Sequence, residues 1–93
     1  MNQKEIPEII EKEKVGSLLF FDDISVEQHS ELLTQIEQAT ILGNTHKRKV
    51  EIVFRDDKGL KKVQTTIWSA GSKFICLKGG VWIPIERIVE III

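Results

Sequence analysis

The 93-residue sequence contains one cysteine, no tyrosine, two histidines and no long apolar run. A single cysteine, Cys76, excludes an internal disulfide, so the fold must be stabilised by packing. The apolar run at residues 18–21 is far shorter than the roughly 20 residues that a membrane-spanning helix needs. Residues 1–14 carry too much charge for a secretory signal. We therefore expect a soluble protein of the cytoplasm with no membrane contact.

Length and composition indicate one globular domain over residues 1–93. The chain is too short for two independent cores, and 42% hydrophobic with 29% charged residues is an ordinary globular balance. The net charge of −1 conceals an asymmetry between two segments. Residues 1–40 carry three basic and nine acidic residues, a balance of −6, whereas residues 41–93 carry ten basic and five acidic residues, a balance of +5. Either the two segments pair internally or one of them meets a charged partner.

The first half of the chain predicts two helices. Pro7 suits a first helical turn and Gly16 a stop, which indicates a helix over residues 7–16. Ser25 and Gln28 fit a capping box, and Gly43-Asn44 fits a left-handed stop, which indicates a second helix over residues 25–43. Residues 18–21 are expected to link them as a buried extended segment. A stripe at three- and four-residue spacing should face the core: Leu32, Leu33, Ile36, Ala39 and Thr40.

After His46 the hydrophobic period changes from 3.6 to 2, which indicates strands. Five strands are expected, at residues 49–55, 61–68, 73–77, 81–83 and 88–92, with a hairpin turn at 56–59 and a single 3₁₀ turn at 85–87. Short strands joined by tight turns favour a small closed or nearly closed barrel. The predicted fold is therefore α+β, with a helical cap at residues 1–44 packed on a five-stranded antiparallel barrel at residues 45–93.

The strand, tight turn and strand, followed by Ile83-Pro84-Ile85-Glu86-Arg87-Ile88, resemble the SH3-like and Sm-like small barrels over residues 49–92. The preceding helix and the closing acid-base-isoleucine run look most similar to the bacterial Rho-inhibitor (Rof-type) barrels. This resemblance implies binding of protein or RNA without catalysis. The chain departs from these families in having no tyrosine for a peptide groove, a basic barrel half where Rof-type barrels are acidic, and no placeable uridine-binding loop.

Residues able to carry catalysis are few and scattered. His29, His46 and Cys76 are not spaced as a nucleophile with a base and an orienting group. Zinc requires clustered cysteine and histidine ligands, which the sequence lacks. The acidic pairs at 22–23 and 56–57 are explained by the start of a helix and by a hairpin turn. We therefore expect no catalytic, cofactor or metal site and no enzyme activity.

Basic and aromatic residues of the second half are the candidate binding residues. Strand alternation directs Lys62, Gln64, Thr66 and Trp68 to the outer face, and Trp82 opposite Val81 and Ile83. Lysines interleaved with outward aromatics would form a stacking platform for single-stranded nucleic acid. The alternative is that the tryptophans pack beneath a helix. The candidate set is Lys47, Arg48, Lys49, Lys61, Lys62, Trp68 and Trp82.

The functional prediction is a non-enzymatic small-barrel binding module whose partner is protein or RNA. The alternative is a structural or homo-oligomerising protein with no nucleic-acid role. The chain closes on Ile91, Ile92 and Ile93, and an apolar edge strand of this kind is a template for pairing unless it is covered. Residues 18–21, or the same strand of a second subunit in a homodimer, are the expected covers, and internal cover is favoured.

Overall fold

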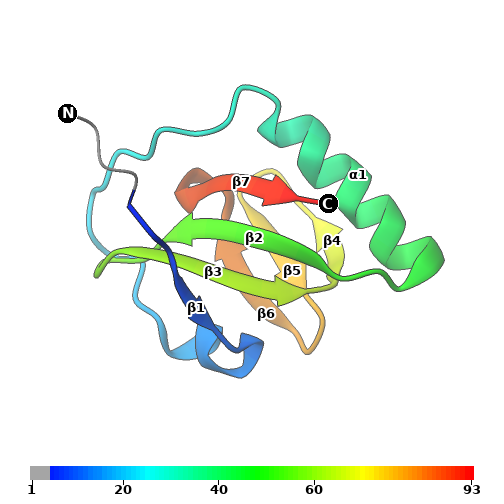
Figure 1. Ribbon diagram of the computed structural model, residues 1–93, viewed down its shortest axis with the longest axis horizontal. Helices are drawn as coiled ribbons and strands as arrows, with labels where there is room; N and C mark the ends of the chain where they lie inside the picture. Colours follow the sequence, from blue (N-terminus) through cyan, green and yellow to red (C-terminus); the bar gives the residue numbers. More distant parts are fainter. Residues whose placement is uncertain (1–4) are drawn as a thin grey trace.

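The computed structural model describes residues 5–93, so the first four residues of the predicted helical cap lie outside this range. One α-helix, two 3₁₀ helices and seven strands make up the described chain (Figure 1). No helix within this range is long and apolar enough to cross a membrane. In chain order the elements are β1 (Glu8–Ile10), η1 (Lys12–Ser17), α1 (Leu32–His46), β2 (Val50–Arg55), β3 (Leu60–Thr65), β4 (Ile67–Ala70), β5 (Phe74–Leu77), β6 (Val81–Pro84), η2 (Ile85–Arg87) and β7 (Ile88–Ile92).

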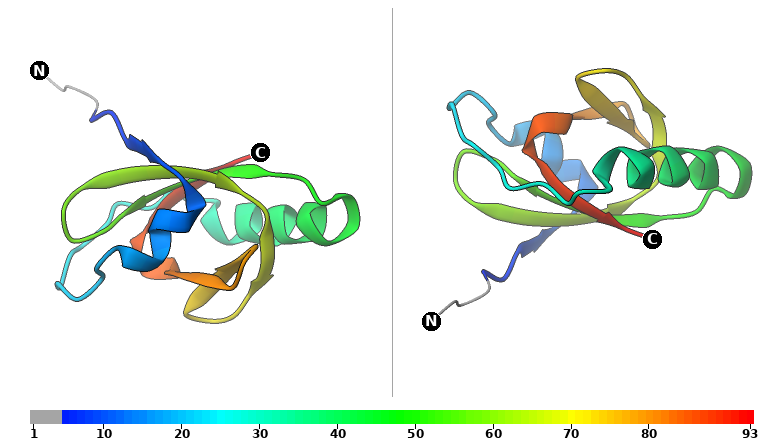
Figure 2. Two further views of the ribbon diagram at one scale, coloured as in Figure 1. Left: turned by 90° about the horizontal axis from the view of Figure 1, so that it is seen from below. Right: turned by 90° about the horizontal axis from the view of Figure 1, so that it is seen from above.

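The predicted five-stranded barrel is wrong, because the strands form two open sheets. One sheet has the order β1-β3-β2-β7 and the other the order β4-β5-β6. The chain leaves the first sheet at Thr66 and enters the second at Ile67. Helix α1 contacts both β7 and β4, and β1 takes the outer edge of β3. The two sheets lie in separate layers with α1 at one end (Figures 1 and 2).

The predicted helix over residues 7–16 is also wrong. Residues 8–10 form β1, which pairs with β3 in parallel and aligns Ile9 with Lys62. Residues 12–17 form η1, from which Val15 is fully buried in the core. A helix here would offer only a narrow apolar stripe, whereas pairing with β3 satisfies the backbone directly.

Helix α1 begins at Leu32, seven residues later than predicted, and Ser25 does not cap it. The Gln28 side-chain amide instead donates to the carbonyls of Ile85 and Ile88, at 2.7 and 2.9 Å. Long-range partners therefore draw the chain before α1 away from a helical path. Three members of the predicted stripe are buried, namely Leu32, Ile36 and Ala39, but Leu33 is 73% exposed.

Residues before and within α1 cover the outer edge of β7. The His29 N–H donates to the Val89 carbonyl at 2.8 Å, and the Ile91 N–H donates to the Gln35 side-chain oxygen at 3.0 Å. Residues 18–21 were expected to cover this edge as a buried segment, but Phe21 is 86% exposed. The edge of β7 is therefore covered within the chain, as the sequence analysis favoured, but by the segment around His29 and by Gln35 of α1.

Helix α1 continues through Gly43 and ends at His46, three residues beyond the predicted stop. A Cβ atom on Gly43 would lie 2.4 Å from the Ile67 carbonyl oxygen, so this glycine permits close approach of the helix to β4. The left-handed residue at the helix end is Lys47, with φ 52°. Its N–H bonds to the Gly43 carbonyl, which is the bond of the αL capping motif, and the Arg48 N–H bonds to the Leu42 carbonyl.

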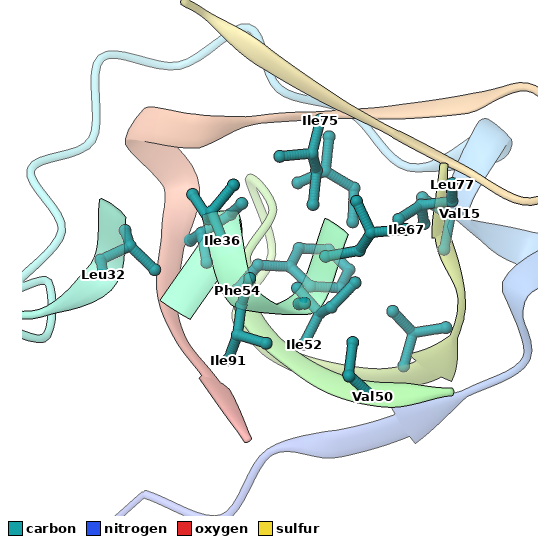
Figure 3. Close-up of a cluster of buried hydrophobic side chains, with 14 residues drawn as sticks. Val15, Leu32, Ile36, Val50, Ile52, Phe54, Ile67, Ile75, Leu77 and Ile91 are labelled. Atoms are coloured by element: carbon teal, nitrogen blue, oxygen red, sulfur yellow. The ribbon is translucent and has the colours of Figure 1, made fainter. Parts of the chain in front are cut away.

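The core lies between the two sheets and is closed at one end by α1. Figure 3 shows Ile36 of the helix near Phe54 and Ile91, with Leu32 at the margin of the cluster and Ile75 reaching in from the second sheet. All five are buried. The helix therefore belongs to the same core as both sheets.

Arg87 fixes the segment before α1 to the β2–β3 hairpin. This guanidinium is 2% exposed and donates to the carbonyls of Arg55 and Asp22 and, at 2.9 Å, to the Asp57 carboxylate. Burial raises the Asp57 pKa, but hydrogen bonds from the Phe21 N–H, the Arg87 guanidinium and the Asp22 N–H together outweigh it. The pKa of Asp57 is therefore held below its ordinary value.

Candidate nucleic-acid interface

The solvent side of the β4-β5-β6 sheet carries exposed aromatic rings. In β5 the side chains of Ile75 and Leu77 point into the core, so Phe74 and Cys76 lie on the other side of the sheet, where Phe74 is exposed but Cys76 is buried. Trp82 of β6 pairs with Cys76 and thus lies on the same side. Its ring meets Phe74 edge-on, at 6.4 Å and 89°, and the two residues are 54% and 45% exposed.

Trp68 joins this face through a β-bulge. The β4–β5 register aligns Ile67 with Leu77 but Ser69 with Cys76, so Trp68 is the extra residue of β4. A bulge re-aims the side chain that it carries. Trp68 is 47% exposed, and the three residues Trp68, Phe74 and Trp82 are called the aromatic face below.

Trp68 also lines a surface hollow of about 340 Å³. The other walls come from the last turns of α1, the bend between the sheets and the β5–β6 turn. The Lys78 N–H donates to the Thr66 carbonyl at 2.9 Å, which holds this turn against the bend. The close approach at Gly43 brings the helix end against the same bend. The hollow, called the Trp68 hollow, is lined by Gly43, Asn44, Lys47, Thr66, Trp68 and Lys78.

The Trp68 hollow is positively charged. It has two lysines and no acidic residue, whereas four other hollows on the described surface each include at least one glutamate. Lys47 and Lys78 are exposed, and neither belongs to any of the ion pairs found within residues 5–93. An anion entering the hollow would therefore meet two lysines not already paired with a carboxylate.

Lys47 occupies a backbone conformation that favours glycine. At φ 52° and ψ 36°, a residue with a Cβ atom is strained by roughly 1 kcal/mol or more. Helices commonly end with a left-handed residue at this position, which is usually glycine. The C-terminal end of a helix also attracts cations, and Lys47 and Arg48 both lie there.

The other predicted lysines lie elsewhere. Lys61 and Lys62 are on β3, in the opposite sheet, where carboxylates already pair with them. Lys61 is only 8% exposed, and its ammonium lies 3.3 Å from Asp56 and 3.4 Å from Glu8. The Lys62 ammonium lies 3.5 Å from Glu51. Neither residue reaches Trp68, because β3 and β4 belong to different layers.

Arg48 and Lys49 are exposed between α1 and β2. Lys49 lines a neighbouring hollow together with Lys78, and two glutamates, Glu11 and Glu13, share that hollow. The structure therefore brings together Lys47 and Trp68 of the predicted set, with Trp82 on the same sheet and Arg48 and Lys49 at the margin.

Asn44, Phe74 and Lys78 were not among the predicted binding residues. Phe74 could have been found, because it alternates with buried Ile75 and Leu77 in the sequence. Asn44 and Lys78 are far apart in the sequence and meet only in the fold. Thr66 was predicted to face outward but is 5% exposed, because the bend between the sheets lies against Gly43.

The chain matches no protein-family model, no curated protein and no solved structure. Its resemblance to SH3-like and Sm-like barrels stays a prediction, and the closed barrel that it implied is wrong. Within residues 5–93, no three histidine, cysteine or acidic side chains gather closely enough to hold a metal ion.

Proposed function

We propose that this chain is a non-enzymatic binding module of the cytoplasm that takes single-stranded RNA on the Trp68 hollow and the adjoining aromatic face. The observation that carries the proposal is the half-exposed Trp68 ring in one hollow with Lys47 and Lys78, which form no ion pair within residues 5–93, and with no carboxylate among the lining residues that the structure describes. Proteins that bind single strands combine aromatic rings, on which bases stack, with a positive surface that follows the phosphates. The Trp68 hollow combines both properties.

The geometry gives less support to a homodimer formed through the C-terminal strand. Pairing of β7 with a second copy would require its outer edge, where the Val89 carbonyl and the Ile91 N–H are already bonded to His29 and Gln35. Such a dimer would have to break these two bonds first. RNA binding at the Trp68 hollow requires no such change.

The net charge of −1 implies weak binding that is strongest at low salt. Two phosphate contacts, from Lys47 and Lys78, predict a slope of log K against log salt of about −1.4 for a single strand. Contacts from Arg48 and Lys49 would steepen it to about −2.8. The slope, measured by anisotropy with a labelled uridine-rich oligonucleotide, therefore counts the participating lysines and arginine.

Substitution of Trp68 tests the stacking directly. Trp68→Ala should weaken RNA binding by about 1–3 kcal/mol, the usual contribution of one stacked base. The matched control is Phe21→Ala, which removes an exposed aromatic side chain that lies outside the hollow, in the segment before α1. Absence of any complex at low ionic strength, or equal losses in the two variants, would refute the proposal.

The lysines offer a second matched pair. Lys78→Gln should weaken binding and reduce the salt slope by about 0.7. Lys62→Gln, which removes a lysine already paired with Glu51, should change neither. Equal effects of the two variants would indicate that RNA is attracted to the positive charges of the whole protein surface and does not bind at a defined site.

A further inference from the structure

We infer that the Trp68 hollow selects adenine and that the side-chain amide of Asn44 reads the edge of the base stacked on Trp68. This inference rests on the proposed function and adds base selectivity to it. Asn44 lies on the last helical turns of α1 and lines the same hollow as Trp68. It is the one side-chain amide among the six lining residues.

The Asn44 amide is available to a ligand. It is exposed, and it takes no part in the side-chain hydrogen bonds formed within residues 5–93. Its neighbours differ, because the hydroxyls of Thr40 and Thr45 donate to the carbonyls one turn earlier in α1, at 2.7 Å in each case. Those two groups are engaged by the helix, whereas the amide offers one donor side and one acceptor side to solvent.

The donor and acceptor of an asparagine amide match adenine, which presents an N6 amino group beside the N7 acceptor. Bases of a single strand have no pairing partner and can be splayed out, so that such edges are open to protein side chains. Guanine presents two acceptors, O6 and N7, and is best read by an arginine or lysine that approaches its edge. The lysines of the hollow have flexible stems and compact charges, which suit the phosphates on either side of the base.

The experiment uses the full chain and four labelled RNA nine-mers at low salt: U9 and the same strand with A, C or G at its centre. We expect the A-containing strand to bind at least about fivefold more tightly than U9, the lower end of the discrimination from one bidentate contact. Asn44→Leu should abolish this preference. Asn44→Gln, which restores an amide, should recover part of it. The control Gln38→Leu removes an exposed amide of α1 that does not line the hollow and should leave the preference intact.

The outcomes separate this inference from the proposed function. Equal binding of all four nine-mers, or an adenine preference that survives Asn44→Leu, overturns the inference and leaves RNA binding in place. Absence of binding by any nine-mer overturns both. Free AMP should bind at least tenfold more weakly than the A-containing strand. Equal affinity for the two would overturn the proposal that the ligand is an RNA strand and would favour a free nucleotide.

Discussion

Replacing Gly43 with alanine tests the contact that sets α1 against β4 and shapes the Trp68 hollow. In an exposed helix interior, this change stabilises a protein by about 1 kcal/mol. Here the new Cβ would lie 2.4 Å from the Ile67 carbonyl oxygen and 3.0 Å from the Thr66 methyl group. The Ile67 oxygen is a backbone atom, so the clash can be removed only if the helix and the strand move apart. Overpacking typically costs about 1–3 kcal/mol, and a backbone clash belongs at the upper end of that range. We expect a net loss of about 2 kcal/mol.

Thermal unfolding followed by circular dichroism measures this loss. For a domain of this size, about 2 kcal/mol corresponds to a fall in Tm of roughly 8–16 °C. The matched control is Asn44→Ala, one residue further along the helix and exposed, where alanine should raise stability by several tenths of a kcal/mol. A Gly43→Ala protein as stable as wild type, or stabilised like the control, would show that α1 does not approach Ile67 so closely.

Three further predictions concern the helix end, one turn and the acid limb of stability. Lys47→Gly should raise the free energy of unfolding by about 1 kcal/mol in thermal melts, because glycine adopts the left-handed conformation without strain. The same variant should weaken RNA binding. A variant less stable than wild type would contradict this prediction. Gly79→Ala and Gly80→Ala should each cost about 1 kcal/mol in denaturant titrations, since both glycines have positive φ, 96° and 82°, with open space around them; no loss in either would refute it. Because the folded-state pKa of Asp57 is lowered, its contribution to stability is present above the unfolded value of about 3.9 and is lost as the pH falls through the folded pKa. Acid titrations of Asp57→Asn should therefore show a shallower loss below about pH 4, and an unchanged acid limb would argue against this role.

Local sequence signals determined several elements by themselves. The last strand and the 3₁₀ turn before it occur at the predicted residues, 88–92 and 85–87. Alternation and turn residues act over a few neighbours, so they identify such segments without knowledge of the fold. Trp68 and Trp82 are exposed, as alternation indicated, although Trp68 was predicted on one strand with Lys62 and lies in the other sheet. Spacing of three and four residues marked Leu32, Ile36 and Ala39 as the buried stripe of α1, although Leu33 of the same predicted stripe is exposed.

Tertiary structure decided the rest, because the deciding partners are distant in the chain. Residues 8–10 are a strand only because β3 offers an edge, and Gln28 leaves its predicted helix to bind carbonyls near residue 88. Gly43 resembles a helix stop in sequence, whereas in the fold it is a point of close contact with Ile67. The division of the strands into two sheets separates Lys61 and Lys62 from Trp68 and brings Asn44 and Lys78 to it. The sequence alone therefore indicated the lysines and tryptophans as candidate binding residues, and only the packing of α1 against the bend between the sheets determined which of them meet.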